Sequence, residues 1–181
     1  MASRPFAWEK SYPEGVSWDA PIKITTLGAL IDGTVKTHGG RTAFEFRDRT
    51  ITYAELGAEA ERFSAALQRA GIGKGMTVAL YLPNTPHHPI SFFGAAKMGV
   101  RLAHLSPLDA ERVLAYKLKD SGARVLVTTD IAPLFGTALK LFEAGLVDRL
   151  IVMDQGRVVA DGPKDQVLAA LAGRTLHVAA G

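Results

Sequence analysis

The residues best suited to bind phosphate lie in a glycine-rich run, Gly71-Ile-Gly-Lys-Gly-Met-Thr. A phosphate-binding loop follows a strand and opens a helix, because helical N–H groups must point at the anion. Here the order is reversed: an amphipathic helical stripe precedes the glycines, and an apolar run beginning at Val78 follows them. We therefore predict that Gly71 ends a helix in a left-handed cap and that the run binds no phosphate.

Histidines are the next candidates, as metal ligands or as acid–base groups. Neighbouring residues on a helix or strand point in different directions, so His87 and His88 cannot share a metal without partners from distant parts of the chain. We predict surface or packing roles for all five histidines: His38, His87, His88, His104 and His177.

The remaining polar candidates have ordinary structural interpretations. Ser106 lacks the Gly-x-Ser-x-Gly surroundings of a hydrolase nucleophile, and we expect it to cap the loop after its strand. Asp109, Glu111 and Asp120 fit helix ends and solvated faces. The sequence therefore predicts no catalytic, cofactor-binding or metal-binding residue in this chain.

Composition excludes several classes of protein. The absence of cysteine rules out disulfides, thiolate nucleophiles and cysteine-based zinc sites. The net charge of +3 comes from 21 basic and 18 acidic side chains that are scattered, so we expect no nucleic-acid partner. Charged residues interrupt residues 1–18, and no apolar run reaches spanning length, so neither a secretory signal nor a transmembrane segment is expected. We expect a cytoplasmic protein.

The elements that must position these residues follow from hydrophobic periodicity. Thr52 and Glu55 have the spacing of a capping box, just before the clearest helical stripe. Strands are expected at 78–82, 100–105, 124–128 and 150–153, and helices at 54–70, 89–98, 110–120 and 133–144. The alternation predicts an α/β fold, a mostly parallel sheet with helices on both faces.

The first fifty residues do not show the alternation of strands and helices that is expected for residues 54–153. Residues 1–24 are rich in proline and aromatic residues and predict an extended arm packed over the domain surface, pinned to the core by Trp8, Tyr12 and Trp18. A helix follows from Thr25 or Thr26, with an apolar stripe of Leu27, Leu30, Ile31 and Val35. Strands at 43–46 and 50–52 should form a hairpin that turns at Asp48-Arg49.

The pattern changes again after residue 153. A turn signal at residues 154–157 predicts a β-hairpin between strands 150–153 and 157–160. Pro163 fits the first turn of a short helix through Leu171. Residues 172–181 should fray. The expected organisation is an arm (1–24), a partial domain (25–153), and a hairpin, helix and tail (154–181).

Several motifs, in order, resemble adenylate-forming enzymes. The stretch Thr50-Ile-Thr-Tyr-Ala-Glu-Leu resembles their first core motif, and Gly73-Lys-Gly-Met-Thr-Val a later strand, with Met76 in place of the usual Asp. Ala95-Ala-Lys-Met-Gly-Val with Leu105-Ser-Pro-Leu resembles the second core motif, and Val100 stands where the family has a small residue. The run from Asp109 is most similar to long-chain fatty acid–CoA ligases. The resemblance covers residues 8–150.

The tail carries a second resemblance. Residues 147–172, including Ile151-Val-Met-Asp-Gln-Gly-Arg-Val, resemble the C-terminal end of an ABC transporter ATPase domain. The Val-Asp-Arg-Leu-Ile-Val strand is common to both families and would be the seam of a chimera. The phosphate loop of ABC ATPases is missing from this chain.

The ligase resemblance implies ATP-dependent chemistry: a carboxylate is joined to AMP, and the acyl group passes to CoA. The family uses ATP, magnesium and CoA, and its Ser/Thr/Gly loop ending in Pro-Lys-Gly is absent from this sequence. We therefore expect a truncated ligase segment that binds no cofactor and is inactive alone. The alternatives are a protein-interaction module, which pairs with itself or with a complementary ligase fragment, and a non-functional chimera or remnant.

Overall fold

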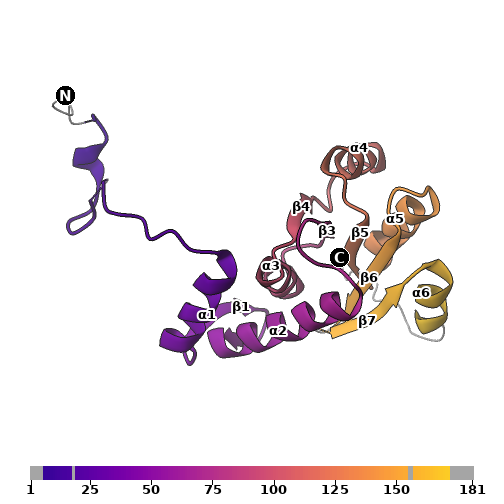
Figure 1. Cartoon of the computed structure of the whole chain (residues 1–181), viewed down its shortest axis with the longest axis horizontal. Coiled ribbons are helices and arrows are strands. Elements are labelled where there is room, and N and C mark those ends of the chain that lie inside the picture. Colours follow the sequence, from indigo (N-terminus) through magenta and orange to yellow (C-terminus); the bar gives the residue numbers. More distant parts are fainter. Residues whose placement is uncertain (1–5, 18, 155–156, 172–181) are drawn as a thin grey trace.

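A twisted β-sheet covered by helices on both faces forms the centre of the molecule (Figure 1). The computed structural model describes residues 6–17, 19–154 and 157–171. Trp18, the turn residues 155–156 and the end 172–181, on which predictions were made, lie outside these described residues. The elements are η1 (Glu9–Ser11), α1 (Leu27–His38), β1 (Thr42–Phe46), β2 (Arg49–Thr52), α2 (Tyr53–Arg69), β3 (Thr77–Tyr81), α3 (His87–Lys97), β4 (Arg101–Leu105), α4 (Glu111–Ser121), β5 (Val125–Thr129), α5 (Ala132–Glu143), β6 (Arg149–Asp154), β7 (Arg157–Gly162) and α6 (Lys164–Leu171).

The main sheet has the strand order β4-β3-β5-β6-β7. The first four of these strands are parallel to their neighbours, and β7 pairs antiparallel with β6. Two of the three interior strands, β3 and β5, are buried along their whole length, which explains why their sequences are continuous, mostly apolar runs. The predicted α/β class, with a mostly parallel sheet, is confirmed, as are the terminal hairpin and short helix.

Each face of the sheet has its own hydrophobic core. One cluster joins the sheet to α1, α2 and α3 through Ile31, Phe63 and Ile90. The other joins the opposite face to α4, α5 and α6 through residues such as Leu118 and Val167. The parallel strands therefore present their ends, and the loops that follow them, at a common edge between two helical layers.

Both ends of α2 are formed by the local contacts that the sequence predicts. The Glu55 backbone N–H donates to Thr52 Oγ1 at 3.2 Å, and the Thr52 backbone N–H donates to Glu55 Oε2 at 2.8 Å, which completes a capping box. These hydrogen bonds, to the backbone and then to the side chain of Thr52, lower the pKa of Glu55. Just beyond the other end of α2, Gly71 has φ +73°, as a left-handed cap requires.

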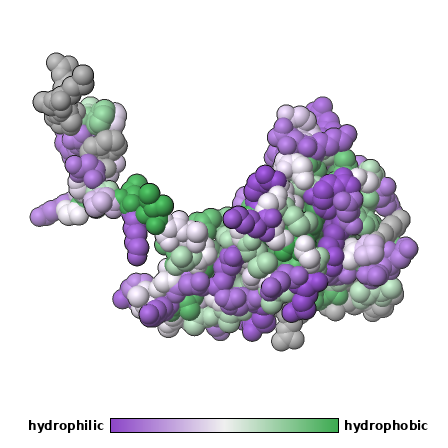
Figure 2. Space-filling model, in the orientation of Figure 1, coloured by the Kyte–Doolittle hydropathy of each residue, from purple (hydrophilic) through white to green (hydrophobic). Residues whose placement is uncertain are grey.

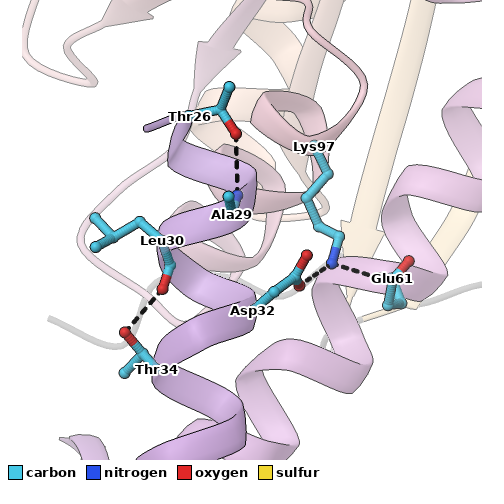
Figure 3. A network of polar contacts seen from close by, with 7 residues as sticks. All are labelled: Thr26, Ala29, Leu30, Asp32, Thr34, Glu61 and Lys97. Atoms are coloured by element: carbon cyan, nitrogen blue, oxygen red, sulfur yellow. Dashed lines mark hydrogen bonds and ion pairs between the residues drawn. The ribbon is translucent and has the colours of Figure 1, made fainter. Parts of the chain in front are cut away.

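The helices α1, α2 and α3 are tied together by one lysine (Figure 3). Lys97 of α3 forms ion pairs with Asp32 of α1 and Glu61 of α2. Burial alone would lower the pKa of Lys97, but the hydrogen bonds to the two carboxylates outweigh it, and the pKa is raised. Thr26 caps α1 by accepting a hydrogen bond from the Ala29 N–H at 3.1 Å.

Two details of the predicted N-terminal half are wrong. The hairpin turns at Arg47-Asp48, one residue earlier than predicted, because Arg47 adopts φ 53° and Arg49 already pairs with Phe46. In α1 the predicted stripe is only half buried: Ile31 is in the core, whereas Leu27 and Leu30 are 46% and 53% exposed.

The prediction that aromatic residues pin the arm to the core is also wrong for Trp8 and Tyr12. Trp8 and Tyr12 are exposed, and the Trp8 ring stacks on Phe6 with centroids 4.5 Å apart. Residues 20–26 run away from the start of α1 without regular secondary structure, and the short segment before them lies away from the sheet and its helices (Figure 1). Figure 2 shows strongly hydrophobic surface where the N-terminal arm joins the rest of the molecule. Within residues 20–26, Ile22 and Ile24 are 90% and 97% exposed.

Candidate functional site

The carboxyl ends of the parallel strands form the edge where a ligand site is expected. The chain passes from β3 to its neighbour β4 on one side and then crosses to β5 on the other side. In open α/β sheets, ligands bind outside the carboxyl ends of strands at such a reversal. The loops 82–86, 106–110 and 130–131, which follow β3, β4 and β5, therefore define the candidate site.

A groove of about 530 Å³ lies at this edge, beside β3 and β4. Its wall combines apolar loop residues with imidazole, amide, hydroxyl and ammonium groups. The lining residues are Leu82, Pro83, Asn84, His88, His104, Leu105, Ser106, Pro107, Leu108 and Lys117. Leu108 is 95% exposed, so the groove has an apolar rim as well as polar groups.

Two histidines meet in this groove. His88, in the first turn of α3, places its Nε2 atom 3.0 Å from the Nδ1 atom of His104 on β4. Their ring centroids are 5.0 Å apart, and Phe92 lies beside His104 at 5.7 Å. Burial, and then the neighbouring His104, lower the pKa of His88. This pair is the feature that sequence reasoning missed, because the two residues are sixteen positions apart.

His87 has different contacts from His88, as expected of two adjacent residues on a helix. Its Nδ1 atom lies 3.1 Å from Thr85 Oγ1. Burial lowers the pKa of His87, and the carboxylates of Asp154 and Asp130 only partly oppose that effect. His87 and His88 therefore have separate partners and do not act as a pair.

Ser106 and Asp109 shape the loop after β4. The Leu108 N–H donates to Ser106 Oγ at 3.2 Å, which confirms that Ser106 caps this loop. Lys117 Nζ donates to Asp109 Oδ2 at 2.6 Å, and this bond lowers the pKa of the Asp109 carboxyl. The positive charge at the groove is thus compensated by a carboxylate.

Two loops of the described chain lack the features of a phosphate-binding turn. The glycine-rich run lies between the end of α2 and the start of β3, so it does not open a helix as a phosphate-binding loop does. The loop that does open a helix, from β3 to α3, contains Pro83 and Pro86, and Pro89 follows in the first turn. Proline has no N–H group to offer to a phosphate.

Residues 6–17, 19–154 and 157–171 contain no group of three or more His, Cys, Asp or Glu side chains that could hold a metal ion. Over the same ranges, no helix combines the length and apolar character needed to cross a bilayer.

Comparison with known proteins gives the family. A model of the family described as AMP-binding enzyme matches residues 31–173. The chain belongs to this AMP-binding enzyme family. The match begins within α1 and includes β7 and α6, so it extends over the tail segment that resembles ABC ATPases. That second resemblance and the domain boundaries built on it stay predictions.

The relatives and solved structures agree with the family. A long-chain-fatty-acid–CoA ligase of Bacillus subtilis is 30% identical over 145 residues, which are 80% of this chain and 26% of the ligase. A benzoate CoA ligase from Burkholderia xenovorans superposes with TM-score 0.66 at 24% identity, over 86% of this chain and 30% of that one. The N-terminal domain of FACL13 from Mycobacterium tuberculosis superposes with TM-score 0.65 at 24% identity, over 87% of this chain and 38% of that one.

The chain spans only part of the length of the relatives that it matches. It corresponds to the N-terminal part of the ligases that it matches, and it spans about a quarter of the length of the Bacillus ligase. The expected resemblance to fatty acid–CoA ligases is confirmed at this level.

Proposed function

We propose that residues 1–181 serve as the N-terminal structural layer of an ATP-dependent fatty acid–CoA ligase and do not adenylate a carboxylate by themselves. The observation that carries this proposal is the family match over residues 31–173, in a chain whose sequence lacks the loop ending in Pro-Lys-Gly. The proline-rich entrance to α3 supports it, because this entrance has few backbone donors for a phosphate.

In the proposed role, this layer supplies a rigid sheet on which the remainder of a ligase assembles. The ATP, magnesium and CoA of the parent reaction are then bound mainly by groups outside residues 1–181. The contribution of this chain is the buried scaffold of β3, β5 and β6 and the loops at their carboxyl ends. The groove beside β3 and β4 would lie on the side facing those ligands.

The test is fatty-acid-dependent exchange of pyrophosphate into ATP, with an active long-chain ligase as the positive control. We expect no exchange above background. The companion measurement is calorimetric titration of ATP–Mg, and then of a long-chain acyl-AMP analogue, into the folded chain, and we expect no heat of binding. Exchange that scales with the amount of chain and survives further purification would overturn the proposal.

A second function, that of an interaction module, is favoured by the apolar surface of the arm and α1. Ile22 and Ile24 are almost fully exposed, and Leu27 and Leu30 are about half exposed. An exposed patch of this kind typically marks an association surface. The partner would be a second copy of the chain or a separately made ligase fragment that lacks this layer.

Sedimentation analysis distinguishes the two functions. An interaction module should self-associate, or should co-sediment with a ligase fragment that lacks the N-terminal layer. The double variant I22S/I24S should weaken that association. A variant at the equally exposed but distant Leu108, L108S, is the matched control and should leave the association unchanged. A clean monomer that ignores the ligase fragment would refute the interaction function.

A further inference from the structure

The His88–His104 pair brings two imidazole nitrogens, one from α3 and one from β4, within hydrogen-bond distance of each other. Imidazole nitrogens are also common metal ligands. His88 projects from the first turn of α3, and His104 from the edge strand β4, which is paired with the rest of the sheet only through β3. Their Nε2 and Nδ1 atoms are 3.0 Å apart. His104 is exposed and His88 half-buried, so an ion can reach both nitrogens from the groove.

A metal ion would replace the hydrogen bond between the two rings. The proton on the bonded nitrogen then moves to the other nitrogen of its own ring, because each ligating nitrogen must be unprotonated. With metal–nitrogen bonds of about 2.0–2.1 Å, two nitrogens 3.0 Å apart subtend roughly 94° at the metal. An angle near 90° is that of square-planar or tetragonal coordination, whereas tetrahedral zinc would need the nitrogens to move apart by roughly 0.3 Å. The hydrogen-bonded spacing is thus compatible with adjacent positions in the coordination sphere of copper(II) or nickel(II), and zinc would need a small further separation.

We propose that His88 Nε2 and His104 Nδ1 chelate one copper(II) or nickel(II) ion at the mouth of the groove. Imidazole nitrogens are suitable ligands for both metals, and copper(II) should bind more tightly by the general order of divalent affinities. The remaining coordination positions face the groove and are open to water or to an external oxygen ligand. Asn84 and Ser106, which line the same groove, can hydrogen-bond to such a ligand.

The surroundings of the pair do not oppose a cation. Lys117, the ammonium group of the groove, is held by Asp109 at 2.6 Å, so its charge is locally balanced. Phe92 packs beside the His104 ring and restricts its orientation. A bound ion would cross-link α3 to β4, which the fold otherwise joins through the loop 98–100 and through packing contacts. The site requires no ligase activity.

The experiment is a calorimetric titration of the untagged full chain with copper(II), and separately with nickel(II). The melting temperature is then measured at each metal concentration. We expect one ion per chain and a rise in melting temperature with metal concentration, because an ion that binds only the folded state stabilises it. Magnesium, which prefers oxygen ligands, should cause no change. The single variants H88Q and H104Q should each weaken copper binding by about tenfold or more.

The controls separate this pair from the other histidines. The variants H87Q and H38Q/H177Q should bind copper as the natural chain does, and a melting curve for every variant checks that it folds. In the unmodified chain, substoichiometric copper should broaden the ring-proton NMR signals of His88 and His104 before those of other histidines. Absence of saturable binding, or binding that survives in both H88Q and H104Q, would show that the pair is only hydrogen-bonded and would overturn the proposal.

Discussion

Substitution of Gly94 by alanine tests the packing that holds α3, and with it His88, on the sheet. Gly94 lies at the contact between α3 and α2, and a Cβ atom there would stand 2.7 Å from the Ala60 carbonyl oxygen and 2.9 Å from Phe63 Cδ1. The first of these atoms belongs to the backbone of α2 and cannot rotate away. The two helices must therefore separate to admit one methyl group.

The expected magnitude combines two opposing effects. Overpacking of a well-packed contact costs about 1–3 kcal/mol, and we take the upper end because the obstacle is backbone. Replacing glycine by alanine inside a helix returns about 1 kcal/mol. The net loss in the free energy of unfolding is therefore about 2 kcal/mol, which corresponds to a fall in melting temperature of about 4–8 °C for a chain of this size.

The assay is thermal and urea denaturation of the natural chain and of G94A, with G33A as the matched control. Gly33 also lies inside a helix, but a Cβ atom there would have no heavy atom within 4 Å. The same substitution should therefore stabilise the chain at Gly33, by about 0.5–1 kcal/mol. Opposite signs for one chemical change isolate the helix–helix contact from helix propensity.

The reasoning would be refuted if G94A were as stable as G33A, because α2 and α3 would then not approach as closely as described. A fall in stability of equal size in both variants would also contradict it, since helix propensity predicts a gain at Gly33. In G94A, we further expect the NMR signals of His88 to shift, because α3 carries this residue.

Three other changes test separate parts of the fold. The pKa of Glu55 is lowered in the folded state, so ionised Glu55 stabilises the fold above the ordinary pKa of 4.5. This stabilisation is lost as the pH falls through the lower pKa of the folded state. E55Q should therefore melt below the natural chain at neutral pH and match it well below pH 4.5. K97M should cost about 1 kcal/mol in urea denaturation through loss of two ion pairs with exposed carboxylates, whereas K36M, an exposed change on α1, should cost less than half of that. L126A removes a fully buried side chain from β5 and should cost about 2–5 kcal/mol, whereas L108A, at a 95% exposed position, should stay within about 0.5 kcal/mol of the natural chain in the same assay.

Local signals in the sequence were sufficient for most elements. The capping box at Thr52 and Glu55 and the glycine at residue 71 determine both ends of α2 through contacts within a few residues. Continuous apolar runs indicated strands covered on both faces, and β3 and β5 are buried along their length. Short-range hydrogen bonds and hydrophobic periodicity are properties of adjacent residues, so a sequence displays them directly.

Predictions that depended on distant contacts were less successful. Periodicity placed Leu27 and Leu30 on the buried side of α1, but only part of this helix finds a partner, and both residues stay exposed. Trp8 and Tyr12 were expected to pack on the core because large aromatic rings usually do, yet the extended segment after them leads away from it. Burial of a side chain depends on what lies opposite, and a local pattern does not contain that information.

The sequence by itself determined the α/β class, the order of the elements and the resemblance of residues 8–150 to one enzyme family, because these depend on local pattern and on the succession of motifs. Only the tertiary structure decided which side chains meet. Parallel pairing of β3 with β4 brings the carboxyl end of β4 beside the start of α3, and so places His104 against His88. Strand pairing is a long-range choice made by the whole core, and for that reason the histidine pair becomes visible only in the folded chain.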